Sequence, residues 1–234
     1  MALDCQAHIS KVGCTVLVKP IVCGGMRRAA SRFQYYTIAE IARRRGDIPL
    51  GWVKWQDFDE LYKEHNTPEN KGRRIVVKSH SHLPHFTKLK IREWDVVTSH
   101  RDLRDVMGSI KAIFPDKKWD KQSFWVELDT VVSEFDRWAG VACAISRYDD
   151  IISDPGIQVH NWSLALGYSM SLVEAEEIAS KYSLEKMQNM GEDGKTNYVP
   201  LGDGSPKRHL LDQVQMHIIE EAWGPWLKKW GYAD

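Results

Sequence analysis

Short apolar runs rich in β-branched residues alternate with longer amphipathic stretches along this chain of 234 residues. The apolar runs predict strands over residues 15–18, 21–23, 75–77, 96–98 and 142–146. Apolar positions that recur at helical spacing predict helices over residues 31–45, 104–113, 124–142, 160–166, 172–187 and 211–230. Strands that alternate with helices predict an α/β fold, in which helices flank a central parallel sheet on both faces.

Two stretches of the chain show neither a strand-like nor a helical pattern of apolar residues. Residues 50–70 are rich in tryptophan and in charge, and we expect them to be irregular or helical. Residues 190–209 are rich in glycine and proline, which predicts a loop. The chain is long enough for one well-cored domain and short for two, so we expect a single domain over residues 1–234.

The charge balance and the cysteines limit the classes of function. With 32 basic and 32 acidic side chains the formal net charge is zero, so the molecule lacks the overall basic field of nucleic-acid-binding proteins. Four scattered cysteines form no C-x-x-C pair, which fits a reducing compartment. We see neither a signal peptide nor an apolar run of the roughly 18 residues that span a bilayer, and we expect a cytoplasmic protein.

The first chemistry-bearing segment runs from Gly24 to Phe33, where a predicted strand passes through glycine into a helix. Such a turn presents free backbone N–H groups at the positive end of a helix, which favours an anion. Arg28 and Arg32 add cations, and Ser31 adds a hydroxyl donor. A solvated basic helix start is the alternative. The Gly-Lys-Ser/Thr of the Walker pattern is absent, which disfavours an ATPase or GTPase.

The second segment is Lys78-Ser79-His80, at the end of a short buried strand. Lys78 and His80 share one side of an extended chain, and ligands of α/β proteins bind at such strand ends. Histidine is a general base near neutral pH, and lysine stabilises developing negative charge. A surface lysine and a core histidine are the alternatives. His80, His82 and His85 are also candidate ligands of a metal ion. Because no carboxylate or cysteine is close to them in the sequence, we expect no metal.

Two further segments follow predicted strands. Arg101 comes directly after one strand, and Ser109 lies two turns into the next helix, so both side chains can reach one phosphate. Tyr148 ends another strand and can line a nucleotide pocket, while Asp154-Pro155 predicts a helix start. Each segment by itself also fits an ordinary α/β layout.

The four segments together resemble, in order and spacing, those of sulfotransferases that use 3′-phosphoadenosine 5′-phosphosulfate (PAPS). Residues 27–33 resemble the 5′-phosphosulfate loop of the family, usually Pro-Lys/Arg-Ser-Gly-Thr/Ser-Thr-Trp. The resemblance implies that Arg28 faces the 5′-phosphosulfate and that Phe33 lies against adenine. Lys78-Ser79-His80 looks like the Lys-Thr-His of the family, which implies that His80 is the base and Lys78 a sulfonate contact.

Arg101 to Ser109 resembles the 3′-phosphate motif Arg-x-Pro-x-Asp-x-x-x-Ser of that family. Tyr148-Asp149-Asp150 resembles its Tyr-Glu-Asp, and residues 226–232 resemble the end of many bacterial members. Near residue 204 the family has a Gly-containing 3′-phosphate segment with an arginine. Gly204 matches its glycine, and either Lys207 or Arg208 can replace the missing arginine.

The chain departs from the family pattern at the phosphosulfate loop. Ala29 and Ala30 stand where Ser-Gly is usual, and the Cβ of Ala30 occupies a place that the family keeps bare. Arg32 replaces a hydroxyl residue, and Leu103 replaces the proline of the 3′-phosphate motif. The resemblance implies that the nucleotide contacts Arg28, Ala29, Ala30, Ser31, Arg32, Phe33, Arg101, Ser109, Tyr148, Gly204 and Arg208.

The resemblance implies a sulfotransferase that moves a sulfonate group from PAPS to a hydroxyl or amine of a small-molecule acceptor, such as a natural product, and leaves adenosine 3′,5′-bisphosphate. An ATP-dependent small-molecule kinase and a non-catalytic nucleotide-binding protein on the same fold are the alternatives. Acidic and aromatic residues around Trp52, Asp57 and Phe58 form either one wall of an acceptor pocket for a cationic or polar molecule or an amphipathic surface helix. We expect neither nucleic acid nor membrane as partner.

Overall fold

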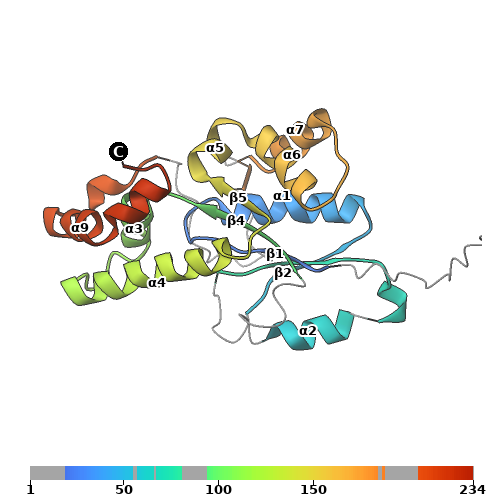
Figure 1. Ribbon diagram of the computed structural model, residues 1–234, viewed down its shortest axis with the longest axis horizontal. Coiled ribbons are helices and arrows are strands. Elements are labelled where there is room, and N and C mark those ends of the chain that lie inside the picture. The colour runs from blue at the N-terminus through green and yellow to red at the C-terminus, as the bar shows by residue number, and fades with distance from the viewer. Residues whose placement is uncertain are drawn as a thin grey trace, which may run out of the picture.

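The computed structural model describes residues 19–54, 57–65, 67–80, 94–183, 186–187 and 205–233. A five-stranded sheet in the order β2-β3-β1-β4-β5 lies at its centre (Figure 1). Every neighbouring pair of strands is parallel. The strands are β1 (Ile21–Cys23), β2 (Ile48–Trp52), β3 (Ile75–Lys78), β4 (Asp95–His100) and β5 (Ala144–Arg147). The predicted α/β fold with a parallel sheet is therefore confirmed.

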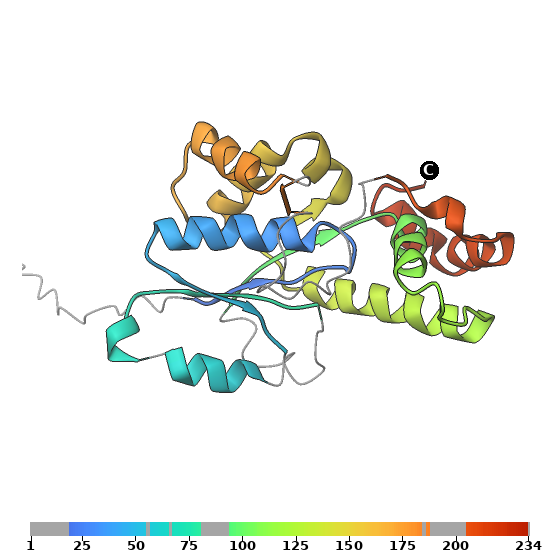
Figure 2. The same cartoon turned by 180° about the vertical axis from the view of Figure 1, so that it is seen from behind.

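Helices cover both faces of this sheet, as Figures 1 and 2 show from opposite sides. One face carries α1 (Ser31–Arg44), α5 (Tyr148–Ser153), α6 (Pro155–Ala165) and α7 (Leu172–Lys181). The other face carries α2 (Phe58–His65) and α4 (Lys121–Ala139). Beyond the end of β4, α3 (Leu103–Ile113) packs with α9 (Gln213–Lys229) and α4. Two short 3-10 turns cover Pro68–Asn70 and Arg208–Leu210.

The alternation of side chains along β1 explains why both faces are covered. Ile21 and Cys23 belong to the apolar cluster shared with α1, α6 and α7. Val22 points the other way, into a cluster with Phe58 of α2 and Trp138 of α4. All three side chains are at most 2% exposed. A strand that is apolar on both sides is stable only when both faces are covered.

The structure differs from the expected elements at three places. Ile48–Trp52 is an edge strand, although we expected residues 50–70 to be irregular or helical. Residues 148–153 form the helix α5, which we did not expect. Helix α6 begins at Pro155, as Asp154-Pro155 predicted, and not near residue 160, where the periodic pattern began. The last helix of that layer, α7, ends at Lys181 and not near residue 187. Residues 15–18 and 190–204 lie outside the described residues.

The register of the central strands brings their C-terminal ends to one edge of the sheet. Cys23, the last residue of β1, pairs with Lys78 on one side and with Val97 on the other. The Ser79 N–H then donates to the Cys23 carbonyl oxygen at 3.2 Å, and the Met26 N–H donates to the Ser99 carbonyl oxygen at 3.1 Å. The segments that follow β1, β3 and β4 therefore emerge side by side.

Candidate active site

The turn between β1 and α1 crosses the end of β4. Ser99 Oγ donates a hydrogen bond to the Ala29 carbonyl oxygen at 2.6 Å and so links the turn to β4. Arg28 and Ala30 have φ angles of 67° and 61°, a left-handed conformation that costs a non-glycine residue about 1–2 kcal/mol. No side chain caps the start of α1, and Ala30 and Ser31 line a cavity there. The positive end of the helix therefore lies at the cavity wall.

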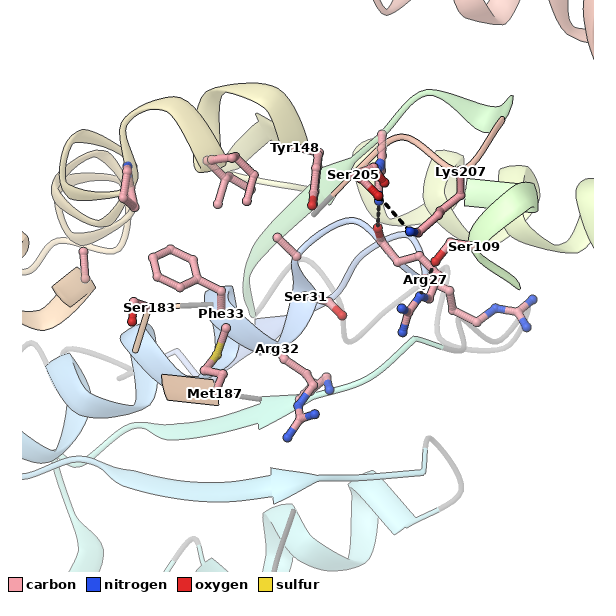
Figure 3. A pocket seen from close by; sticks show the side chains of 18 of the residues that line it. Arg27, Ser31, Arg32, Phe33, Ser109, Tyr148, Ser183, Met187, Ser205 and Lys207 are labelled. Atoms are coloured by element: carbon pink, nitrogen blue, oxygen red, sulfur yellow. Dashed lines mark hydrogen bonds between the residues drawn. The ribbon is translucent and has the colours of Figure 1, made fainter. Parts of the chain in front are cut away.

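The cavity has a volume of about 740 Å³ (Figure 3). Near the strand ends basic and hydroxyl side chains line it, whereas toward α6 and α7 apolar side chains alternate with Asp154, Glu176, Ser180 and Ser183. The basic and hydroxyl side chains include Arg27, Arg28, Lys78, His80, Arg101, Ser109, Ser205 and Lys207. The apolar side chains include Phe33, Ile110, Ile113, Phe114, Ile151, Ile152, Pro155, Ala179 and Met187.

One contact orients the imidazole of His80, and another holds its backbone. Its Nδ1 lies 3.2 Å from the Gly25 carbonyl oxygen, and the indole Nε1 of Trp138 donates to the backbone oxygen of His80 at 3.1 Å. A carbonyl oxygen only accepts, so Nδ1 carries the proton of the neutral ring and Nε2 keeps its lone pair. Burial, together with the charge of Lys78, lowers the pKa of His80 to about 3. The imidazole is therefore neutral at physiological pH and can accept a proton at Nε2.

Two cations accompany this imidazole. Lys78 is the last residue of β3 and is only 5% exposed. Arg28 projects from the turn, and its Nε donates to Ser109 Oγ at 2.9 Å. Burial and the neighbouring Arg101 lower the pKa of Arg28, but an arginine that starts so high remains cationic at neutral pH. Both side chains line the same cavity as His80.

Arg101 extends this basic group across the cavity. Its guanidinium carbon lies 4.0 Å from the ring centroid of Tyr148, and its Nη2 donates to the Ser205 carbonyl oxygen at 3.2 Å. Stacking on an aromatic face fixes the plane of a guanidinium, and this group is 6% exposed. Burial raises the pKa of the Tyr148 hydroxyl, which therefore stays protonated as a hydrogen-bond donor. The structure thus brings together His80, Lys78, Arg28, Arg101, Ser109 and Tyr148.

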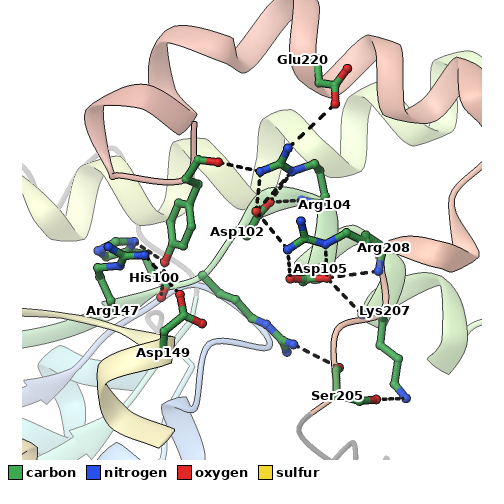
Figure 4. Close-up of polar contacts among 12 residues, drawn as sticks. His100, Asp102, Arg104, Asp105, Arg147, Asp149, Ser205, Lys207, Arg208 and Glu220 are labelled. Atoms are coloured by element: carbon green, nitrogen blue, oxygen red, sulfur yellow. Dashed lines mark hydrogen bonds and ion pairs between the residues drawn. The ribbon is translucent and has the colours of Figure 1, made fainter. Parts of the chain in front are cut away.

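Other members of the predicted nucleotide-contacting set do not line the cavity. Arg208 is absent from the cavity lining and pairs with Asp105, its Nη2 lying 2.7 Å from Oδ2 (Figure 4). The neighbouring Lys207 does line the cavity, and Gly204 lies outside the described residues. Ala29 is fully buried in the cluster of α3, α4 and α9, so its methyl group faces away from the cavity.

The remaining residues of the turn and of α1 lie along the cavity. Ala30, Ser31, Arg32 and Phe33 all line it, and Phe33 rests against Trp162 with ring centroids 6.0 Å apart. Trp52, Asp57 and Phe58 are not in the lining, and Phe58 is buried in the core between the sheet and α2.

Sequence reasoning missed Ser205 and most of the apolar lining. A signal did exist on α3, because Ile110, Ile113 and Phe114 share the helical face that begins at Ser109. No comparable pattern indicated Met187 or Ser205, because long-range packing brings them to the cavity.

Within the described part of the chain, no group of three or more His, Cys, Asp or Glu side chains is placed to hold a metal ion. His82 and His85 lie outside that part. None of the described helices combines the length and the apolar character needed to cross a bilayer.

Comparisons with known proteins place this fold. No protein-family model matches the chain, and no curated protein matches it. Among solved structures it is similar to mouse sulfotransferase SULT7A1 complexed with PAP, with a TM-score of 0.62 and 14% identity over 90% of this chain and 85% of that chain. Retinol dehydratase in complex with androsterone and inactive cofactor PAP gives a TM-score of 0.62 and 17% identity, over 91% and 81%. The same enzyme in a complex with retinol and PAP gives a TM-score of 0.58 and 15% identity, over 90% and 81%.

These similarities establish the fold: the chain has the P-loop-like α/β fold of sulfotransferases.

Proposed function

We propose that this protein is a PAPS-dependent sulfotransferase that transfers a sulfonate group to a hydroxyl or amine of a small-molecule acceptor. One observation carries the proposal. A single cavity at the ends of the parallel strands contains a neutral imidazole with its Nε2 left to accept a proton, together with Lys78, Arg28 and Arg101. This combination provides a base and several cations without requiring a metal.

The donor set of the cavity fits a nucleotide with two phosphate-bearing ends. Arg28 and the start of α1 suit the 5′-phosphosulfate, because cations and free backbone N–H groups bind such an anion. Arg101 and Ser109 suit a 3′-phosphate. The aromatic ring of Phe33 suits a purine base. When bound, PAPS supplies the sulfonate group that is transferred.

The residues of the chain then have distinct tasks. His80 Nε2 accepts the proton of the acceptor hydroxyl or amine as that group attacks the sulfur atom. Lys78 and Arg28 stabilise the negative charge that develops on the sulfonate and on the departing phosphate oxygen, as cationic clamps do in phosphoryl transfer. The hydrogen bond from His80 Nδ1 to Gly25 keeps the imidazole in the required tautomer.

The test is sulfonate transfer from radiolabelled PAPS to a panel of phenols, alcohols and amines. The wild-type protein is expected to label at least one acceptor class, and His80→Ala is expected to lose turnover while it still binds adenosine 3′,5′-bisphosphate. Thermal shifts with that nucleotide and with ATP/Mg²⁺ separate this function from a kinase. Stabilisation by ATP/Mg²⁺ alone, or full activity of His80→Ala, would contradict the proposal.

A further inference from the structure

The segment Ser205–Leu210, which we call the strap, lies across α3 beside Ser109. One carboxylate on α3 holds much of it (Figure 4). Asp105 Oδ1 accepts hydrogen bonds at 3.1 Å from the backbone N–H groups of Lys207 and Arg208 and from Arg208 Nε. Its Oδ2 accepts from Arg208 Nη2 at 2.7 Å. Asp105 is 5% exposed, so these contacts form where water competes little.

A second, steric contact joins the strap to the same helix. A Cβ atom added to Gly108 would lie 2.1 Å from the Lys207 carbonyl oxygen, far inside contact distance. The backbone of the strap therefore reaches α3 only because residue 108 has no side chain. Asp105, Gly108 and Ser109 are three and four positions apart and share one face of the helix.

These contacts give two neighbouring cations opposite surroundings. The Arg208 guanidinium pairs with Asp105 and also contacts Asp102 Oδ2 at 3.3 Å. Lys207 instead lines the cavity, where its Nζ donates to Ser205 Oγ at 2.7 Å. The strap also contacts Arg101, whose Nη2 donates to the Ser205 carbonyl oxygen at 3.2 Å. The side chain of Lys207 therefore lies on the cavity side that holds Arg101 and Ser109.

We infer that Asp105 is a positioning residue for nucleotide recognition: it holds the strap on α3 and pairs with Arg208, so that Lys207 is the strap cation that faces the 3′-phosphate. The inference rests on the proposed function. It assigns the contact with the nucleotide to Lys207 and not to the adjacent Arg208. Burial opposes ionisation of Asp105, but the hydrogen bonds and charge of Arg208 outweigh it and hold the pKa of the carboxyl below its ordinary value. The carboxylate is therefore charged at neutral pH.

The experiment compares adenosine 3′,5′-bisphosphate with adenosine 5′-monophosphate by isothermal titration calorimetry. Asp105→Asn keeps the size of the side chain but removes its charge. It is expected to weaken binding of the bisphosphate about tenfold, as the loss of a hydrogen bond to a charged group does, and to change binding of the monophosphate less than twofold. Lys207→Ala is expected to act in the same direction. The double variant should be no weaker than Lys207→Ala alone, because Asp105 acts through Lys207.

Gly108→Ala tests the contact between the strap and α3 sterically, because the added methyl group pushes the strap away from the helix. It should also lower affinity for the bisphosphate selectively. Asp120→Asn is the matched control: Asp120 caps α4 through the Ser123 N–H, and asparagine caps equally well. Equal weakening of both nucleotides by Asp105→Asn, additive effects in the double variant, or unchanged selectivity in Lys207→Ala would overturn the inference. A wild-type protein with no preference for the bisphosphate would instead overturn the proposed function.

Discussion

Arg28 Nε donates a hydrogen bond to Ser109 Oγ across 2.9 Å, and this contact joins the turn after β1 to the helix after β4. The two residues are 81 positions apart in the chain. In the proposed function Arg28 faces the 5′ end of the nucleotide and Ser109 its 3′-phosphate. On that proposal, the hydrogen bond directly links the side chains assigned to the two phosphate groups.

Loss of Arg101 or Ser109 should reduce affinity for the 3′-phosphate selectively. Arg101→Ala removes a buried guanidinium, and we expect tenfold to hundredfold weaker binding of adenosine 3′,5′-bisphosphate, since a charge-assisted hydrogen bond contributes roughly 1.5–3 kcal/mol. Ser109→Ala should act in the same direction by about tenfold. Binding of the 3′-dephospho analogue should change much less. Lys118→Ala, at a side chain that is 88% exposed, is the charge control. Equal weakening of both nucleotides would remove the 3′-phosphate assignment.

The protonation state of His80 can be observed directly. Its hydrogen bond to the Gly25 carbonyl oxygen and its pKa of about 3 predict a neutral ring protonated at Nδ1 throughout pH 5 to 8. Two-dimensional ¹H–¹⁵N spectra that correlate ring nitrogens with ring protons distinguish the two tautomers and the imidazolium, and His80→Gln identifies the signals. A ring that titrates near pH 6.5 would contradict the lowered pKa. A ring protonated at Nε2 would contradict the assignment of Nε2 as the proton acceptor.

Local pattern was sufficient for the central elements and for most of the polar end of the cavity. The short β-branched runs before Gly24, Lys78 and Arg101 have the length and composition of buried strands, and the ends of parallel strands meet at one edge. The edge strand β2 was missed because Pro49 and Gly51 interrupt it, and its ladder shows a register shift between these two residues.

The choice between Lys207 and Arg208 could not be made from the sequence either. Arg208 turns away from the cavity because Asp105, 103 positions earlier, captures it, and no local pattern reports a contact of that range. The same holds for Met187, which tertiary packing brings into one apolar cluster with Phe33 at the cavity.

Two histidines make the stability of the fold depend on pH. Burial lowers the pKa of His100 to about 4 and, aided by Lys78, that of His80 to about 3. Between these values and pH 6.5 the unfolded chain binds more protons than the folded one, so stability is complete above pH 6.5 and is lost as the pH falls. For His100 the loss from pH 7 to pH 5 is expected to be about 2 kcal/mol.

Urea unfolding of wild type and His100→Gln at pH 7 and pH 5 checks this expectation. The variant should be less stable at pH 7, because His100 packs among Phe135, Trp230 and Tyr232, but should lose less stability on acidification. His217→Gln is the surface control, at a side chain that is 73% exposed. The same pH dependence in wild type and His100→Gln would contradict the predicted linkage.

Two adjacent alanines in the turn should respond to glycine with opposite signs. Ala30 has a left-handed φ of 61°, and Ala30→Gly should raise the free energy of unfolding by about 0.5–1 kcal/mol, because relief of about 1–2 kcal/mol of strain exceeds the entropic cost of glycine. Ala29 is fully buried and outside the left-handed region, so Ala29→Gly should lower it by about 1–2 kcal/mol through the lost methyl group and added chain freedom. Urea unfolding at pH 7 measures both. Equal losses of stability in both variants would contradict the expectation that the left-handed backbone of residue 30 is strained. Retention of nucleotide affinity by Ala30→Gly would further show that nucleotide binding does not require the Cβ of residue 30.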